Sequence, residues 1–114
     1  MAAKDITNLI ERLEAFEDRL NVRLEAMSAQ LDEISDDAIY LEVRGELHPK
    51  DGMELGHDHL VLVVAAYDSD SRVIGTTKEY FTKENFFGFN VFNISVSVPV
   101  NSLKRIRIYP ERCE

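Results

Sequence analysis

The stretch HLVLVVAAY, residues 59–67, contains the longest apolar run of the sequence, residues 60–67, and decides how the chain folds. Its side chains are apolar at consecutive positions, which is typical of a strand that is covered on both faces. The turn-forming residues 68–71, DSDS, follow it, and residues 72–77, RVIGTT, resume an extended pattern. These features predict a β-hairpin whose first strand lies in the middle of a sheet.

Alternating apolar and polar residues predict further strands on both sides of this hairpin. Residues 39–44, IYLEVR, alternate in this way, and so do residues 92–98, FNISVSV, and residues 105–108, RIRI. We find no helical spacing between these strands. The sequence therefore predicts a small antiparallel β-sandwich domain over residues 38–114.

The last of these strands is basic, because residues 104–107 read KRIR. One interpretation is an edge strand whose charges keep it from pairing with other chains. The other interpretation is a docking face for the acidic helices of a neighbouring chain.

The segment VAAYDSDSRVIGTT, residues 64–77, resembles the signature of the bacterial FxLYD domains. Tyr67 and Asp68 match the last two letters of that signature, and Gly45 matches the glycine of the family's first strand. The resemblance covers residues 39–109. It implies an immunoglobulin-like sandwich that serves as a non-catalytic interaction module.

Charge divides the chain near residue 37. Residues 1–37 carry four Lys/Arg against ten Asp/Glu, a net of −6, out of −8 for the whole chain. Residues 38–114 carry nine Lys/Arg against eleven Asp/Glu, a net of −2. Gly45 is the first glycine, and no proline precedes it. We therefore predict two domains that meet near residue 37.

Apolar residues in the first domain, residues 1–37, recur at steps of three and four, the spacing of a helix with a heptad stripe. We predict one long coiled-coil α-helix here, so that the fold class is α+β, with the helix followed by the immunoglobulin-like sandwich. The residues predicted to form an oligomer interface along this stripe are Ile6, Leu9, Leu13, Phe16, Leu20, Leu24, Met27, Leu31 and Ile34.

This stripe predicts a homo-oligomer of two to four chains. The segment has no opposite-charge pair at i,i+4, which is the usual support of a single exposed helix. The heptad positions also set Arg12 of one chain against Glu17 of the next, an attractive pair in a parallel bundle. The alternative is a helix that lies along the core of its own domain.

All three histidines of the sequence fall within residues 48–59. His57 and His59 would point to the same side of an extended chain and could chelate zinc, with Glu54, Asp51 or His48 as a third ligand. A polar loop that leads into the central strand is the simpler interpretation. A metal-dependent ligand-binding protein or an enzyme that uses this loop is therefore the alternative function.

Composition and motifs exclude several classes of function. An isoelectric point near 4.8 argues against a nucleic-acid partner, and the apolar runs are too short to span a membrane. No G-x-S-x-G elbow and no glycine-rich phosphate loop occurs, so we expect no catalytic residue and no cofactor. We expect a cytoplasmic, non-enzymatic protein, either an oligomeric scaffold or a module that binds a protein partner.

Overall fold

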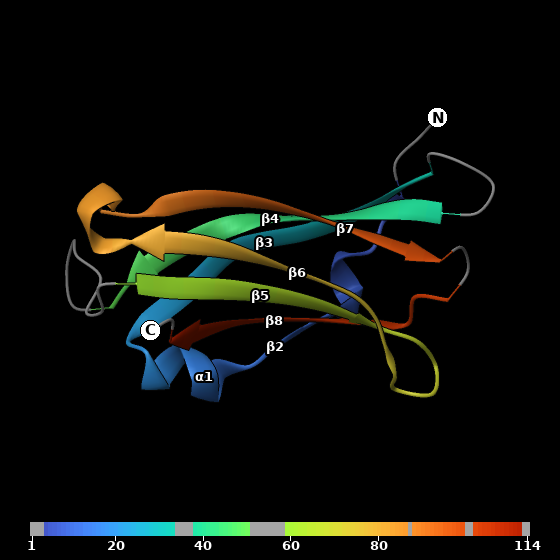
Figure 1. The fold of residues 1–114 in the computed structure, drawn as a ribbon, viewed down its shortest axis with the longest axis horizontal. Helices are drawn as coiled ribbons and strands as arrows, with labels where there is room; N and C mark the ends of the chain where they lie inside the picture. The colour runs from blue at the N-terminus through green and yellow to red at the C-terminus, as the bar shows by residue number, and fades with distance from the viewer. Residues whose placement is uncertain (1–3, 34–37, 51–58, 87, 100–101, 113–114) are drawn as a thin grey trace.

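The chain folds as two facing β-sheets in the computed structural model, which describes residues 4–33, 38–50, 59–86, 88–99 and 102–112 (Figure 1). The strands are β1 (Lys4–Asp5), β2 (Ile10–Arg12), β3 (Val22–Glu33), β4 (Ala38–Pro49), β5 (His59–Tyr67), β6 (Val73–Thr82), β7 (Asn90–Pro99) and β8 (Arg105–Arg112). The helical elements are η1 (Thr7–Leu9), α1 (Glu14–Arg19) and η2 (Lys83–Asn85). Sheet A has the order β1-β3-β4-β7, and sheet B has the order β2-β8-β5-β6.

The predicted long N-terminal helix is wrong, and with it the α+β fold class. The fold is mostly β, and α1 is the one α-helix in the described residues. None of the helices in those ranges is long and apolar enough to cross a membrane. The longest element within the predicted helix is instead β3, which pairs antiparallel with β4 over ten positions. These two strands lie on either side of residue 37, where the two domains were expected to meet.

A β-bulge in β3 explains the misleading period. Alternate side chains of a strand face the same way, so Val22 and Leu24 both lie in the core. The bulge after Glu25 inserts one extra residue, and Met27 becomes the next side chain that packs on the core. Leu31 follows four residues later. A bulged strand thus reproduces the steps of three and four that are typical of a heptad.

The predicted oligomer interface is used within the chain. Six of its residues lie in the core or pack against it, and they are Ile6, Leu9, Leu20, Leu24, Met27 and Leu31. Phe16 packs edge-on against Tyr109, with 5.3 Å between the ring centroids. Leu13 is the N-cap residue of α1, and Ile34 lies outside the described residues. A coiled coil along this stripe is therefore ruled out, while the oligomeric state stays a prediction.

The prediction of a β-sandwich is confirmed, and its two sheets also contain β1, β2 and β3 from the first part of the chain. β5 coincides with the apolar stretch of residues 59–67 and lies between β6 and β8, as expected of a central strand. Leu62 and Val64 of β5 are fully buried in the core. β8 lies between β2 and β5, so the interpretation of its basic residues as an edge strand is wrong.

The two long sides of the sandwich are closed in different ways. On one side β6 meets β7, where the Thr77 hydroxyl donates to the Ser95 carbonyl. Gly75 allows this approach, because a Cβ there would lie 2.8 Å from a Val96 methyl and 2.9 Å from the Ser97 carbonyl oxygen. The N-terminal segment covers the other side.

This N-terminal segment, residues 4–20, passes from one sheet to the other (Figure 1). β1 pairs with β3 in sheet A, and β2 then pairs in parallel with β8 in sheet B. Between these strands, the backbone N–H of Ile6 donates to the Ala29 carbonyl, and the Ala29 N–H donates to the Thr7 hydroxyl. The segment thus supplies an edge strand to both sheets.

An ion pair between the partly exposed Arg12 and the buried Glu17 fastens the N-terminal segment to β3. The Glu17 side chain in α1 is 3% exposed and accepts hydrogen bonds from Arg12 at 2.6 and 3.0 Å. It also accepts the backbone N–H of Leu24 at 2.9 Å, while Arg12 donates to the Leu24 carbonyl at 2.6 Å. The pair predicted between chains therefore forms within one chain. Its two side chains satisfy the backbone groups that a neighbouring strand would otherwise pair with.

Glu17→Ala should destabilise the chain by about 2 kcal/mol, because it leaves the buried Leu24 N–H without its acceptor and Arg12 without its carboxylate partner. Glu14→Ala, an exposed acid in the same helix, is the matched control and should cost less than about 1 kcal/mol. Urea denaturation measures both values. Equal losses for the two variants would show that the ion pair does not fasten the segment.

A second carboxylate, that of Glu79, is partly buried and has an oxygen without a partner among the described residues. Glu79 lies opposite Leu62 in the register of β6 with β5, and therefore on the core side of sheet B. Its Oε2 atom is shielded from solvent and finds no hydrogen-bond partner within the described ranges. Desolvation raises the pKa of this carboxyl above its ordinary value. The folded state thus holds the Glu79 proton more tightly than the unfolded chain does.

Ionisation of Glu79 should therefore lower stability as the pH rises from about 4 to about 7. We expect Glu79→Gln to raise the melting temperature at about pH 7, with the gain disappearing toward pH 4. Glu111→Gln, on the outer face of the same sheet, should show no such trend. Thermal unfolding followed by circular dichroism at several pH values measures this effect. A gain that does not change with pH would contradict the assignment.

Candidate functional site

The residues predicted to bind a metal do not come together. His48 lies on β4 at the outer face of sheet A, whereas His59 is exposed at the start of β5, on the outer face of sheet B. Asp51, Glu54 and His57 lie outside the described residues. No group of three or more metal-ligating side chains occurs in the part of the chain that the structure describes.

His48 is instead engaged with its neighbours on sheet A. Its Nε2 atom lies 3.0 Å from a Glu46 carboxylate oxygen and 3.3 Å from one of Glu25. Its ring stacks on Phe89, with 4.9 Å between centroids and 7° between the planes. These contacts account for the histidine as part of a polar surface.

Three tyrosines and three cations share the outer face of sheet B, on β5, β6 and β8. The strand pattern places them there, because Leu62 and Val64 join the core and Val63 between them points outward. The register sets Lys78 and Tyr109 on either side of Val63. We call this surface the tyrosine–arginine face, and its residues are Tyr67, Lys78, Tyr80, Arg105, Arg107 and Tyr109.

The floor of the tyrosine–arginine face is apolar. Val61, Val63 and Ala65 point away from the core, yet they are only 3%, 3% and 4% exposed. The long side chains of β6 and β8 flank them and cover them with their apolar parts. Tyr80 stands at one end of this floor and is 64% exposed. The face thus offers the exposed ring of Tyr80 together with the polar groups at the tips of its other side chains.

The two arginines of the face are held in place. The guanidinium groups of Arg105 and Arg107 lie 5.2 and 5.1 Å from the centre of the Tyr67 ring. Glu11 of β2 accepts a hydrogen bond from Arg107 at 3.0 Å and lies 3.7 Å from Arg105. A hydrogen bond with Tyr67, and then one with Glu11, raises the pKa of Arg107 above its ordinary value. Contacts with Tyr67 and Glu11 therefore restrain both guanidinium groups in the free chain.

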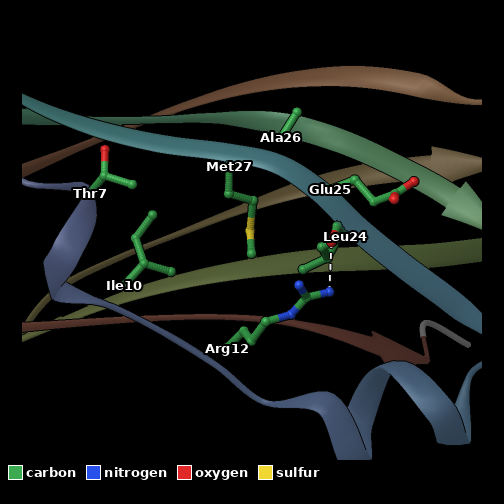
Figure 2. Close-up of a pocket in the computed structure, with 7 residues that line it drawn as sticks. All are labelled: Thr7, Ile10, Arg12, Leu24, Glu25, Ala26 and Met27. Atoms are coloured by element: carbon green, nitrogen blue, oxygen red, sulfur yellow. Dashed lines mark hydrogen bonds between the residues drawn. The ribbon is translucent and has the colours of Figure 1, made fainter.

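A cleft of about 270 Å³ opens between β2 and β3, on the side of β2 that faces away from the tyrosine–arginine face (Figure 2). Figure 2 shows Ile10 and Met27 pointing toward each other above the Arg12 guanidinium, which reaches the Leu24 carbonyl. The full lining is Thr7, Ile10, Arg12, Leu24, Glu25, Ala26 and Met27. The volume is below that of most small-molecule sites, so the cleft suits one side chain better than a whole ligand.

The backbone beside this cleft is strained. Ala26, in the bulge of β3, has φ 55°, a left-handed conformation that costs a residue with a Cβ about 1 kcal/mol. Strain of this kind persists where the surrounding structure imposes it, and here the contacts of Leu24 and Ala29 on either side of the bulge do so.

Sequence reasoning found part of the tyrosine–arginine face. It singled out residues 104–107 as basic and considered a docking role for them. It did not connect Lys78, Tyr80 and Tyr109 with them, because these residues meet only through the pairing of β5 with both neighbours. Polar residues at alternate positions in β6 and β8 were the available signal.

The chain has no match among family models or curated proteins. Among solved structures, a β-glucuronidase from glycoside hydrolase family 2 is similar, with a TM-score of 0.47 and 9% sequence identity. The similarity covers 82% of this chain and 11% of that chain, so this chain spans a small part of the enzyme's length. A similarity at this level does not bear on what the chain does.

Ala26→Gly should stabilise the chain by about 0.5 kcal/mol, because glycine adopts φ 55° without steric cost and loses only part of that gain to entropy. Ala15→Gly, at an exposed position of α1, is the matched control and should destabilise by about 1 kcal/mol. Urea denaturation distinguishes the opposite signs. A loss of stability in both variants would show that Ala26 is not strained.

Proposed function

We propose that the chain is a non-enzymatic protein-interaction module that binds a protein partner through the tyrosine–arginine face. The observation that carries this proposal is the gathering of three tyrosines and two ordered arginines over an apolar floor. Tyrosine and arginine are enriched in protein interfaces and among the residues that dominate binding energy.

The restraint of Arg105 and Arg107 in the free protein also supports a role in binding a protein partner. Binding usually costs the freedom of the long side chains that it immobilises. Tyr67 and Glu11 already restrain Arg105 and Arg107, so this cost is small for the two arginines. Tyr80 adds a large exposed ring with few rotatable bonds. The face is therefore suited to contact with another protein.

The resemblance to the FxLYD interaction modules is compatible with this role and remains part of the proposal. The order β3-β4-β7 facing β8-β5-β6 agrees with an immunoglobulin-like sandwich, in which β2 takes the place of the last strand. A cytoplasmic location and self-association stay predictions of the sequence.

Affinity purification from the cells that make the protein tests the proposed function. The chain carrying Lys78→Ala and Tyr80→Ala should lose the partner that the wild type retains, because both side chains extend from the face. With the purified partner, we expect the dissociation constant to rise about tenfold or more, as measured by calorimetry.

The matched control carries Tyr40→Ala and Arg44→Ala, which remove one exposed tyrosine and one exposed cation from the outer face of sheet A. This control should retain the partner with unchanged affinity. A partner lost by the control and kept by the Lys78/Tyr80 variant would contradict the proposal. So would the absence of any partner that depends on these two side chains.

A further inference from the structure

The tyrosine–arginine face differs in charge from the rest of the molecule. The whole chain has a net charge of −8. Among the described residues, this face carries three cations, and Glu11 and Glu111 are the carboxylates beside them. The outer face of sheet A has the opposite balance in the described residues, with two arginines among five carboxylates, which are Arg23, Arg44, Asp5, Glu25, Asp32, Glu42 and Glu46.

Two of the cations and the most exposed aromatic ring lie at opposite ends of the face. Arg105 and Arg107 lie at the end nearest Tyr67, while Tyr80 lies at the opposite end, where β6 pairs with Val61. Side chains two residues apart on a strand are about 7 Å apart, so the two arginines match carboxylates at alternate positions of an extended segment. The same segment would bring an apolar or aromatic residue to Tyr80.

Lys78 has donor capacity to spare for such a segment. Its ammonium group is 4.0 Å from the nearest Glu111 oxygen, which is longer than a charged hydrogen bond of about 2.8 Å. The Lys78 side chain is 49% exposed. A carboxylate of a partner could therefore bind Lys78 without breaking a close ion pair.

We infer that the tyrosine–arginine face recognises an acidic, extended segment of another protein, with carboxylates at Arg105, Arg107 and Lys78 and an aromatic residue at Tyr80. This inference rests on the proposed function and names the chemistry of the partner. A nucleic acid is the less suitable polyanion, because most of the molecule would repel its closely spaced phosphates. At physiological salt, the cations of the face act over about 8 Å, the range of a bound segment.

A synthetic peptide tests the inference independently of the natural partner. The probe is a fluorescent ten-residue peptide with tryptophan at one end and glutamates at alternate positions, and its matched control has glutamine in place of every glutamate. Fluorescence anisotropy with the intact chain should show binding of the acidic peptide, weakening as salt rises, and no binding of the control peptide. Lys78→Glu and Arg107→Glu should each weaken binding about tenfold or more, whereas Arg44→Glu should not weaken it.

Folding of each variant is checked by its circular dichroism spectrum, and Lys78→Glu keeps the test valid if Arg107→Glu fails to fold. Equal binding of the glutamine peptide, or no binding of the acidic peptide at low salt, would overturn the inference. The proposed function would survive that result if the natural partner still depended on Tyr80.

Tighter binding of a single-stranded oligonucleotide of equal charge would overturn the inference in favour of nucleic acid. Self-association that Lys78→Glu abolishes would overturn it in favour of a second copy of the chain.

Discussion

The carboxylate of Glu17 holds the N-terminal segment, residues 4–20, against the side of the sandwich that this segment covers. It receives two hydrogen bonds from Arg12 and one from the backbone of Leu24, and it is almost completely buried. Burying a carboxylate is costly, but here the ion pair also satisfies the edge of β3, which would otherwise be open to pairing with another chain. β1, β2 and α1 depend on this attachment, because each is too short to be stable alone.

β2 links this closure to the candidate binding surface. Its three residues alternate, so that Ile10 and Arg12 face the cleft while Glu11 faces the outer side of sheet B. Arg12 fastens β2 to β3, and Glu11 orients Arg107 on the tyrosine–arginine face. A change that releases the N-terminal segment would therefore also disorder the arginines. This coupling connects the stability of the fold with the proposed recognition of an acidic segment.

The limits of sequence reasoning follow from particular residues. Alternation predicted the strands of the second half correctly, since Phe92, Ile94 and Val96 all lie in the core. The N-terminal pattern misled because one bulge shifts the alternation at Met27, and because true helical turns at η1 and α1 precede the strand. The absence of i,i+4 ion pairs was evidence against a helix, although it was interpreted as evidence for a bundle. The metal prediction rested on His57 and Glu54, which lie outside the described residues, and on two histidines that face opposite ways.

The sequence by itself determined the central strand, the hairpin at residues 68–71 and the core positions of β7 and β8, because a period of two is a local property of the chain. It also determined the attraction between Arg12 and Glu17. Only the tertiary structure decided that this pair forms within one chain, because that depends on β3 presenting its Leu24 backbone to both side chains. The tyrosine–arginine face is likewise a product of tertiary structure. Its residues come from three strands, and only the register of those strands brings them together.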